Sequence, residues 1–370
     1  MAVYKIFPEK DATLYSEYPN TNTGIDEIIE ATTSTETDGG EPAVSRFLIK
    51  FNQSQILDVI NSKATGSIAS SLRVFVAKVE GLSQETTLYC YPVSGSWQNG
   101  TGKYLDSPAV ENGVSWNFRT SSGSGAWLTS GFGSTGATAS FSASNPGGGN
   151  WYTASLYAQS ASYQYRSDLD INLNVTNTVL AWYSGSIQND GFIVKQADSA
   201  EFSTDLTKRV QFKYFSVDTN TIYPPQLELK WNDFTYNTGS STQTVVTDPD
   251  VVVTLPNNSG TYYPESIQRF RLNARPQFPP RVFLTSSFYT TNYYLPTASY
   301  WSVVDLDTNE VVIDFDSTYT KISADSTSNY FDLYMNGLEP ERYYKILLKT
   351  IIDGATRVLD EKYYFKVING

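Results

Sequence analysis

The sequence contains no histidine and a single cysteine among its 370 residues. Without histidine the chain lacks the usual general base near neutral pH and the commonest metal ligand. The lone cysteine, Cys90, stands in the apolar run 88–91 and has no intrachain partner for a disulfide, so we expect it to be buried. These absences predict a protein that is not an enzyme and that uses no cofactor.

Positive charge is also scarce. The chain has 26 Lys and Arg against 38 Asp and Glu, which gives a formal net charge of −12. Nucleic-acid backbones and anionic lipids attract basic surfaces, so we expect no nucleic-acid partner and no membrane insertion. No stretch approaches the roughly 20 apolar residues of a membrane span, and the start, MAVYKIFPEKDATLY, has no apolar core of a signal peptide. The sequence predicts a soluble protein made in a host cytoplasm.

Aromatic residues, by contrast, make up 14% of the chain, while charged residues make up only 17%. This composition favours pleated sheets over helices, and the length suits more than one hydrophobic core. We therefore expect an all-β protein with a jelly-roll-like β-sandwich over residues 1–234, a polar linker over 235–250 and an immunoglobulin-like β-sandwich over 251–370.

Short runs rich in β-branched and aromatic residues mark the strands, and one short helix interrupts them. Residues 54–63 (SQILDVINSK) predict this helix, because Ser54 can cap it and Ile56, Leu57 and Ile60 share one face. Hairpins are expected over 301–315, around the turn 307–309, and around Asp353-Gly354. The clearest other predicted strands are 46–51, 72–79, 191–195 and 226–231.

The N-terminal part resembles a known family of non-catalytic sandwich domains. The segments KDATLYSEYPNTNTGIDE, SRFLIKF, SLRVFVAK, LYCYPVSGSWQNGTG and PPQLELKW, in this order, resemble DNRLRE-type β-sandwich domains over roughly residues 7–232. The resemblance implies a binding or structural jelly roll similar to carbohydrate-binding modules, with no catalytic residues.

Two further resemblances concern the C-terminal part and the whole chain. The segment LYMNGLEPERYYKILLKT is similar to the late strands of immunoglobulin and fibronectin-type domains, with Leu338, Pro340 and Tyr344 at the matching positions. Tyrosine-rich, histidine-free chains of this kind are similar to virion structural proteins of tailed phages, particularly marine myoviruses. This likeness implies a place in a virion.

Several aromatic residues beside Gly, Ser and Asn loops are candidates for contacting glycans, because sugar C–H faces stack on aromatic rings. The alternative is that these rings pin long loops to the sandwich. Other tryptophans are flanked by apolar strand residues and are expected in the core, namely Trp116, Trp182, Trp231 and Trp301. The candidate glycan-contact residues are Trp97, Trp127, Trp151, Tyr152 and Tyr163.

A cluster of arginines between 269 and 281 stands out in this acidic chain. Arg269, Arg271, Arg275, Phe278 and Arg281 lie in a Pro-containing stretch that is a candidate docking arm for an acidic neighbour. The alternative is an ordinary strand entry whose arginines are solvated.

Asp305, Asp307 and Asn309 have the spacing of a calcium loop, and they are weak candidates for a metal site. Glu310 stands where such a loop needs its turn glycine, so a hairpin tip that caps its own turn is the favoured interpretation. We therefore expect no metal.

The sequence thus predicts a non-enzymatic structural protein of a tailed-phage virion, located in its tail, baseplate or neck. Its expected partners are other virion proteins and further copies of itself. The alternative function is a carbohydrate-binding adhesin that recognises a host surface polysaccharide, and a third, weaker one is a glycan-cleaving depolymerase.

Overall fold

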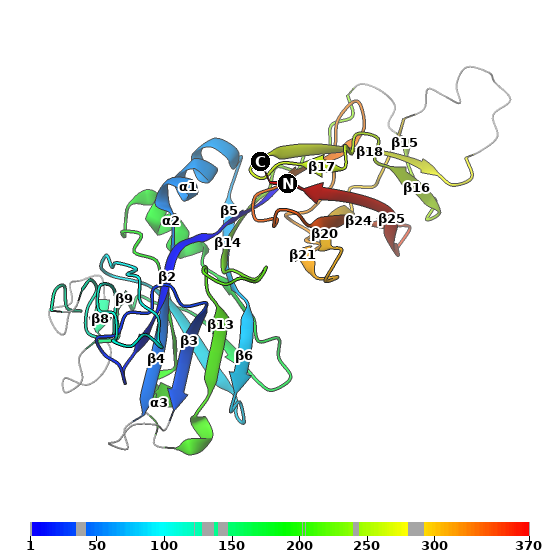
Figure 1. The fold of residues 1–370 in the computed structure, drawn as a ribbon. Helices are drawn as coiled ribbons and strands as arrows, with labels where there is room; N and C mark the ends of the chain where they lie inside the picture. The colour runs from blue at the N-terminus through cyan, green and yellow to red at the C-terminus, as the bar shows by residue number, and fades with distance from the viewer. Residues whose placement is uncertain are drawn as a thin grey trace. The chain divides into compact units, whose positions relative to one another are not determined.

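The computed structural model describes residues 2–34, 42–121, 123–127, 137–139, 147–201, 203, 205–239, 244–279 and 292–369. Among these residues, strands account for 44% and helices for 8%, which confirms the all-β prediction (Figure 1).

The chain forms two compact units. The N-terminal unit comprises Ile6–Ser62 and Ala69–Glu228, and the C-terminal unit comprises Met1–Lys5, Lys63–Ile68 and Leu229–Gly370. The segment 235–250, expected as a linker, takes part in the strand pairing of the C-terminal unit. Within it, β15 (Thr244–Val245) runs parallel to β19 (Tyr293–Tyr294), and a main-chain N–H of Ala324 donates to Thr235.

The strands up to Trp231 form two main sheets. One sheet has the order β10-β7-β12-β4-β3-β13-β6, with β2 also paired to β4, and the other has the order β1-β14-β5-β11. The strands are β1 (Ala2–Ile6), β2 (Pro8–Tyr15), β3 (Ile28–Ser34), β4 (Ala43–Phe51), β5 (Ile68–Val74), β6 (Val76–Glu80), β7 (Thr86–Pro92), β8 (Ala137–Ala139), β9 (Asn150–Tyr152), β10 (Gln159–Tyr163), β11 (Ile171–Asn174), β12 (Phe192–Gln196), β13 (Gln211–Phe215) and β14 (Gln226–Trp231).

The larger sheet curls so that its own strands enclose a core. Phe47 on β4 contacts Tyr214 on β13, and Tyr163 on β10 contacts Phe212 on β13, with ring centroids 5.7 and 5.6 Å apart. Each of these rings lies on the inner face of its strand. The period-two pattern therefore places one face of each strand inside the curl.

Strand β4 is buried on both faces, because a second core lies on the outer side of the sheet. There Leu14, Leu48 and Ile193, from β2, β4 and β12, pack against tryptophans from the connecting loops and from β9. This outer core includes Trp97, Trp116, Trp127 and Trp151. Long loops thus cover the sheet as a packed layer.

The predicted helix exists, with a different cap. It is α1 (Gln53–Asp58), followed by a π-helical turn over Val59–Lys63, and the side chain of Asn52 accepts the N–H groups of Ser54 and Gln55. Asn52 is therefore the cap in place of Ser54.

The expectation of a single short helix needs correction. A nine-residue helix, α2 (Thr176–Ser184), buries Val179 and Trp182 and ends at Gly185, whose φ of 73° lets the chain turn away. Its Thr and Val content has low helix propensity, so packing decides its conformation. Short helical turns also form at α3 (Asp198–Glu201) and at Leu206–Lys208.

The C-terminal unit is a sandwich of two sheets. One has the order β15-β19-β18-β23-β22 with β16 also paired to β18, and the other has the order β17-β25-β24-β20-β21. Its remaining strands are β16 (Val251–Thr254), β17 (Thr261–Tyr262), β18 (Ile267–Pro276), β20 (Ser299–Asp305), β21 (Val311–Ile313), β22 (Ser323–Ala324), β23 (Asn329–Tyr334), β24 (Tyr343–Ile352) and β25 (Ala355–Val367).

This strand order is that of an immunoglobulin-like sandwich. β16-β18-β23-β22 correspond to strands A, B, E and D, and β25-β24-β20-β21 correspond to strands G, F, C and C′. Trp301 on strand C stacks on Phe331 across the core, with ring centroids 4.9 Å apart. The hydroxyl of Tyr344, at the start of strand F, donates to the Glu339 carbonyl over 3.1 Å, which forms the tyrosine corner of this fold class.

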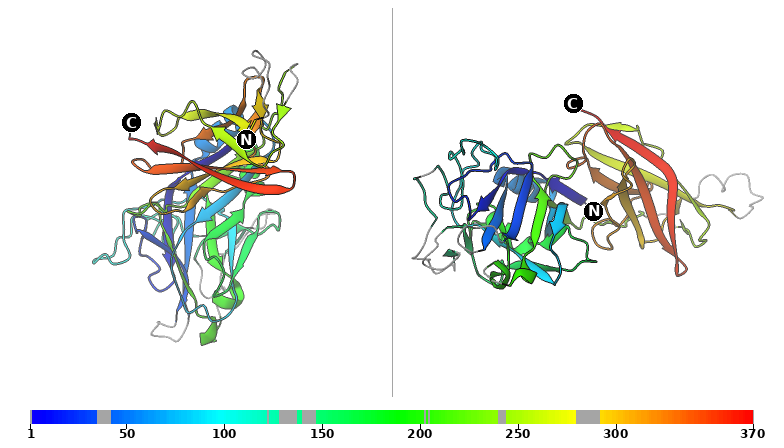
Figure 2. Two further views of the ribbon diagram at one scale, coloured as in Figure 1. Left: turned by 90° about the vertical axis from the view of Figure 1, so that its right-hand side faces the viewer. Right: turned by 60° about the horizontal axis from the view of Figure 1, so that its bottom comes forward.

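Both predicted hairpins of this unit are confirmed. β20 and β21 are joined by the turn around Asp307, and the long β24–β25 hairpin, orange and red in Figure 2, turns at Asp353 and Gly354. These two turn residues have φ of 49° and 77°, the left-handed conformations of the tight turns that suit paired strands.

Candidate functional site

Four of the predicted glycan-contact aromatics are buried. The exposed fractions of Trp97, Trp127, Trp151 and Tyr163 are 3%, 2%, 5% and 3%, and Tyr152 is half-buried. A platform for sugar stacking must present a ring face to solvent. The prediction that these four rings contact glycans is therefore wrong. All four expected core tryptophans, at 116, 182, 231 and 301, are buried.

The buried tryptophans anchor loops to the sandwich, as the alternative interpretation proposed. The indole N–H of Trp97 donates to the Asp190 carbonyl over 2.8 Å, and that of Trp127 donates to the Ser115 carbonyl over 3.0 Å. Each hydrogen bond satisfies a polar atom inside an otherwise apolar contact. The rings therefore fix the loop layer to the sheet.

A buried charge cluster lies against the same tryptophans and was not predicted. Arg46 donates to both carboxylate oxygens of Glu201 over 3.0 and 2.7 Å, and Lys195 lies 3.0 Å from that carboxylate. The guanidinium carbon of Arg46 also lies 5.0 and 5.3 Å from the ring centroids of Trp116 and Trp151. Because these charges are fully enclosed, the cluster organises the fold and offers no access to a ligand.

The predicted docking arm is mostly the regular strand β18. Arg269 and Arg271 form two-point ion pairs with Asp332 and Asp325 of the same unit, so their charges are satisfied within the chain. Arg275 donates only to nearby main-chain carbonyls, and Phe278 is 74% exposed. Arg281 lies outside the described residues. The prediction of an extended docking arm is therefore corrected: its first residues, Arg269 and Arg271, lie on a regular strand and form ion pairs within the chain.

The calcium candidates form the hairpin tip. Asp305 accepts the N–H groups of Asp307 and Thr308 and two hydrogen bonds from Arg342, while Asn309 adopts a φ of 59° in the turn. Burial raises the pKa of Asp305, but these hydrogen bonds outweigh burial and hold it below its usual range. Its oxygens are therefore committed to donors. Across the described ranges, no cluster of three or more acidic or cysteine side chains could hold a metal ion.

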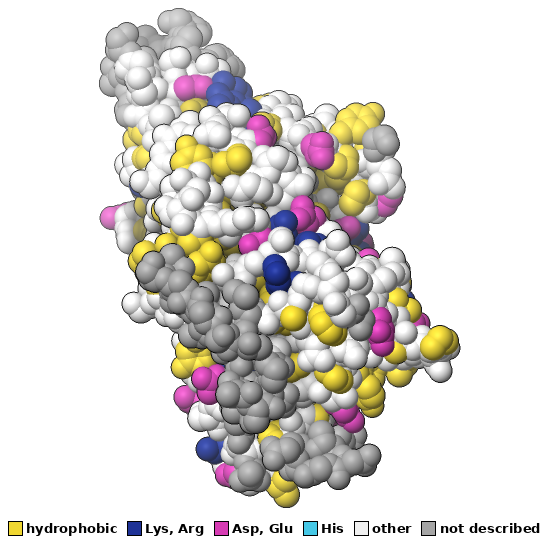
Figure 3. Space-filling model, turned by 90° about the vertical axis from the view of Figure 1, so that its left-hand side faces the viewer, with side chains coloured by type: hydrophobic (Ala, Val, Ile, Leu, Met, Phe, Trp, Pro, Cys, Tyr) yellow, Lys and Arg dark blue, Asp and Glu magenta, His cyan; other side chains and the backbone are white. Residues whose placement is uncertain are grey.

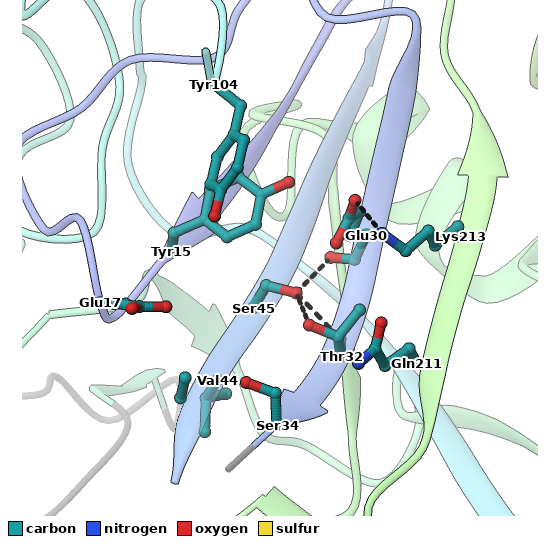
Figure 4. A pocket seen from close by; sticks show the side chains of 11 residues that line it. Tyr15, Glu17, Glu30, Thr32, Ser34, Val44, Ser45, Tyr104, Gln211 and Lys213 are labelled. Atoms are coloured by element: carbon teal, nitrogen blue, oxygen red, sulfur yellow. Dashed lines mark hydrogen bonds and ion pairs between the residues drawn. The ribbon is translucent and has the colours of Figure 1, made fainter. Parts of the chain in front are cut away.

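A pocket of about 210 Å³ opens where β2 and β3 separate along the same edge of β4 (Figure 4). Tyr15, the last residue of β2, pairs with Ser45 of β4. Val44, which precedes Ser45 in the chain, pairs instead with Thr33 of β3. Strand β3 then leaves this edge to pair with β13. A strand that passes from one layer to another leaves a gap at the corner, and this gap is the pocket.

Side chains close the floor of the pocket where the main-chain ladder is interrupted. The Ser45 hydroxyl accepts the N–H of Thr32 over 2.9 Å and lies 2.8 Å from the Thr32 hydroxyl. Beside it, Lys213 of β13 and Glu30 of β3 form an ion pair with the two charged atoms 3.0 Å apart. Figure 4 shows these groups between a tyrosine pair at one end and Ser34 with Val44 at the other.

The tyrosine pair consists of Tyr15 and Tyr104, with ring centroids 4.6 Å apart. Tyr104 is 39% exposed and also meets Tyr18 edge-on. Burial, together with neighbouring carboxylates, raises the pKa of Tyr15 well above its usual value, and burial chiefly raises the pKa of Tyr104 to about 12. Both phenols therefore keep their protons at neutral pH.

The pocket has an excess of negative charge. Glu17 and Glu30 face a single ammonium group, that of Lys213, and the remaining polar lining is uncharged. On the face of the molecule in Figure 3, Lys and Arg side chains occur in small separate groups among polar atoms. Sequence reasoning missed this pocket because its residues come from four strands and two loops. The available signal was the pair Tyr15 and Tyr18, three positions apart, since both rings contact Tyr104.

Comparisons with known proteins add little. No family model and no curated protein matches the sequence. Among solved structures, a DUF4785 family protein from Legionella pneumophila is 10% identical, with a TM-score of 0.18. The alignment covers 98% of this chain and 65% of that protein, and a likeness at this level carries no argument about function. Within the described residues, helices are too short and polar to cross a membrane.

Proposed function

We propose that the protein is a non-enzymatic structural protein of a tailed-phage particle, which works by contacting further copies of itself and other virion proteins. The observation that carries the proposal is the outer face of the β24–β25 hairpin, which presents apolar side chains to solvent. The immunoglobulin-like fold of the C-terminal unit supports it, because such sandwiches commonly present surfaces for recognition.

The apolar side chains of this face follow from strand alternation. Tyr344, Ile346 and Leu348 point into the core, so the residues that alternate with them on β24 point outward. The β25 residues that pair with these outward-pointing residues share their face. Four of these are large and exposed, with fractions of 49%, 37%, 54% and 40% for Tyr343, Ile351, Val358 and Tyr364. Exposed apolar side chains gathered on one face are typical of a protein contact surface.

The charges on this face suit a second copy of the same chain. Lys345 pairs with Asp360 over 2.9 Å, and Lys366 pairs with Glu341. Both signs therefore border the apolar side chains. In a twofold interface the same patch meets itself, so a patch that carries both signs can place each charge opposite its complement. We infer that this hairpin mediates self-association.

The alternative role, a carbohydrate-binding adhesin, receives no support from the rings first assigned to it. Three of those five rings, Trp97, Trp127 and Trp151, are enclosed in the outer core, and Tyr163 is buried inside the curl of the larger sheet against Phe212, so no sugar can reach their faces. Any glycan contact would have to use other residues.

Self-association through the hairpin is tested by the mass of the protein in solution. We expect light scattering to give a multiple of the 41.2 kDa chain mass, and the double substitution Val358→Asp with Tyr364→Asp to reduce it to one chain mass. Two carboxylates on an apolar contact are costly to bury. Leu105→Asp, at an 86% exposed position of the N-terminal unit, is the matched control and should leave the mass unchanged. A monomeric wild-type protein would contradict the proposal, as would a double variant that associates like the control.

A further inference from the structure

We propose that the pocket bordered by Tyr15, Tyr104, Glu30 and Lys213 binds a single neutral sugar residue. This inference goes beyond the assembly role, since it uses a different unit of the chain and none of the hairpin residues. It also differs from the buried aromatic set, because here a tyrosine ring is accessible.

The size of the pocket sets the size of the ligand. At about 210 Å³, it is smaller than the roughly 300 Å³ at which sites for drug-sized molecules begin. One sugar ring with its hydroxyl groups is of this order, whereas an extended segment of chain is not. The ligand would therefore be a terminal or branching residue of a glycan.

The lining has the two kinds of group that a sugar requires. Tyr104, 39% exposed and backed by Tyr15, offers an aromatic surface for C–H faces at one end of the pocket (Figure 4). Gln211 supplies an amide that can both donate and accept, and Thr32 supplies a hydroxyl. Sugar hydroxyls also donate and accept, so a mixed lining matches them better than a lining of one kind.

The positions of the polar groups are fixed before any ligand arrives. Glu30 is held by Lys213 at 3.0 Å, and its main-chain N–H donates to the Thr13 hydroxyl over 3.0 Å. The Thr32 main chain is held by Ser45. Groups fixed on paired strands need little reordering on binding, which favours affinity for a small ligand.

The charge of the pocket selects a neutral ligand. Two carboxylates against one ammonium group repel phosphates and sugar acids. A cationic ligand is also disfavoured, because the more enclosed carboxylate, Glu30, is already neutralised by Lys213, and Glu17 lies exposed at the rim. An uncharged, hydroxyl-rich molecule meets neither penalty.

The test is saturation-transfer NMR followed by titration calorimetry on the full chain. The probes are the methyl glycosides of glucose, galactose, mannose and N-acetylglucosamine, with methyl glucuronide as the anionic comparison. We expect at least one neutral glycoside to bind, the glucuronide to bind more weakly than its glucose counterpart, and Tyr104→Ala to weaken binding about tenfold, since a lost aromatic contact costs about that factor.

Two further variants make the result specific. Gln211→Ala, which leaves the tyrosines in place, should also weaken binding of the same glycoside. Tyr165→Ala, at an 86% exposed tyrosine that is not part of the pocket lining, should leave it unchanged. The proposal is overturned if no neutral glycoside binds, if the glucuronide binds best, or if both pocket variants bind like the wild-type protein. None of these results bears on the solution mass, so the two proposals fail separately.

Discussion

Replacing Glu201 by Ala is expected to lower the free energy of unfolding by about 3–5 kcal/mol, because it removes the buried carboxylate that Arg46 and Lys195 share. Arg46 and Glu201 are both 0% exposed, and the carboxylate accepts two hydrogen bonds from Arg46 and lies 3.0 Å from Lys195. Without it, the two buried cations lose their common counter-charge, and Lys195 keeps the carboxylate of Asp198, whose side chain is 80% exposed. Urea denaturation followed by tryptophan fluorescence measures the change.

The control for this substitution is the surface ion pair of Glu9 and Lys50, whose side chains are 32% and 23% exposed. Glu9→Ala should change stability by less than about 1 kcal/mol, since solvent screens such pairs. If Glu201→Ala is no more destabilising than Glu9→Ala, the buried cluster does not hold the loop layer to the sheet.

Replacing Asp11 by Asn should make the protein more stable at pH 8 than the wild type, by about 3–5 kcal/mol. Asp11 on β2 is 1% exposed, and its carboxyl group accepts the N–H of Val217 over 2.7 Å. Burial raises the pKa of Asp11 to about 8, and Asp218 and Asp26 add to this effect. Asparagine keeps an acceptor for Val217 and cannot ionise.

The direction of the pH dependence follows from the raised pKa. Between about pH 4 and pH 8 the folded protein holds a proton that the unfolded chain has lost, so the Asp11 contribution to stability falls as pH rises through this window. Asp26, with its pKa raised to about 6 chiefly by burial, acts in the same direction. Stability measured from pH 5 to pH 8 should therefore decline more steeply for the wild type than for Asp11→Asn. If the stability of both proteins declined equally with pH, the raised pKa of Asp11 would be contradicted.

The parts of the fold that sequence patterns predicted are those determined by local residues. Short runs of apolar, β-branched and aromatic residues predicted β4, β12 and β14, and Asp353-Gly354 marked the turn of the longest hairpin. Tyr344 was recognised from the segment around it, since a tyrosine corner involves residues only five apart. Helix α2 was missed because its β-branched residues have low intrinsic helix propensity.

The candidate sites were harder to predict because they depend on distant residues. Whether Trp97 or Trp151 faces solvent depends on loops that fold back over the sheet, and no local pattern encodes this. Arg46 and Glu201 are 155 positions apart in the chain. The pocket arises from a change of strand partner at Ser45, which neither β2 nor β3 reveals alone.

The measurement that tests the central claim most directly is mass spectrometry of phage particles purified by density gradient from a source whose genome carries this sequence. A structural protein should sediment with the particles in many copies and remain after a high-salt wash. Peptides of this chain found only in the particle-free fraction of the lysate would contradict the account.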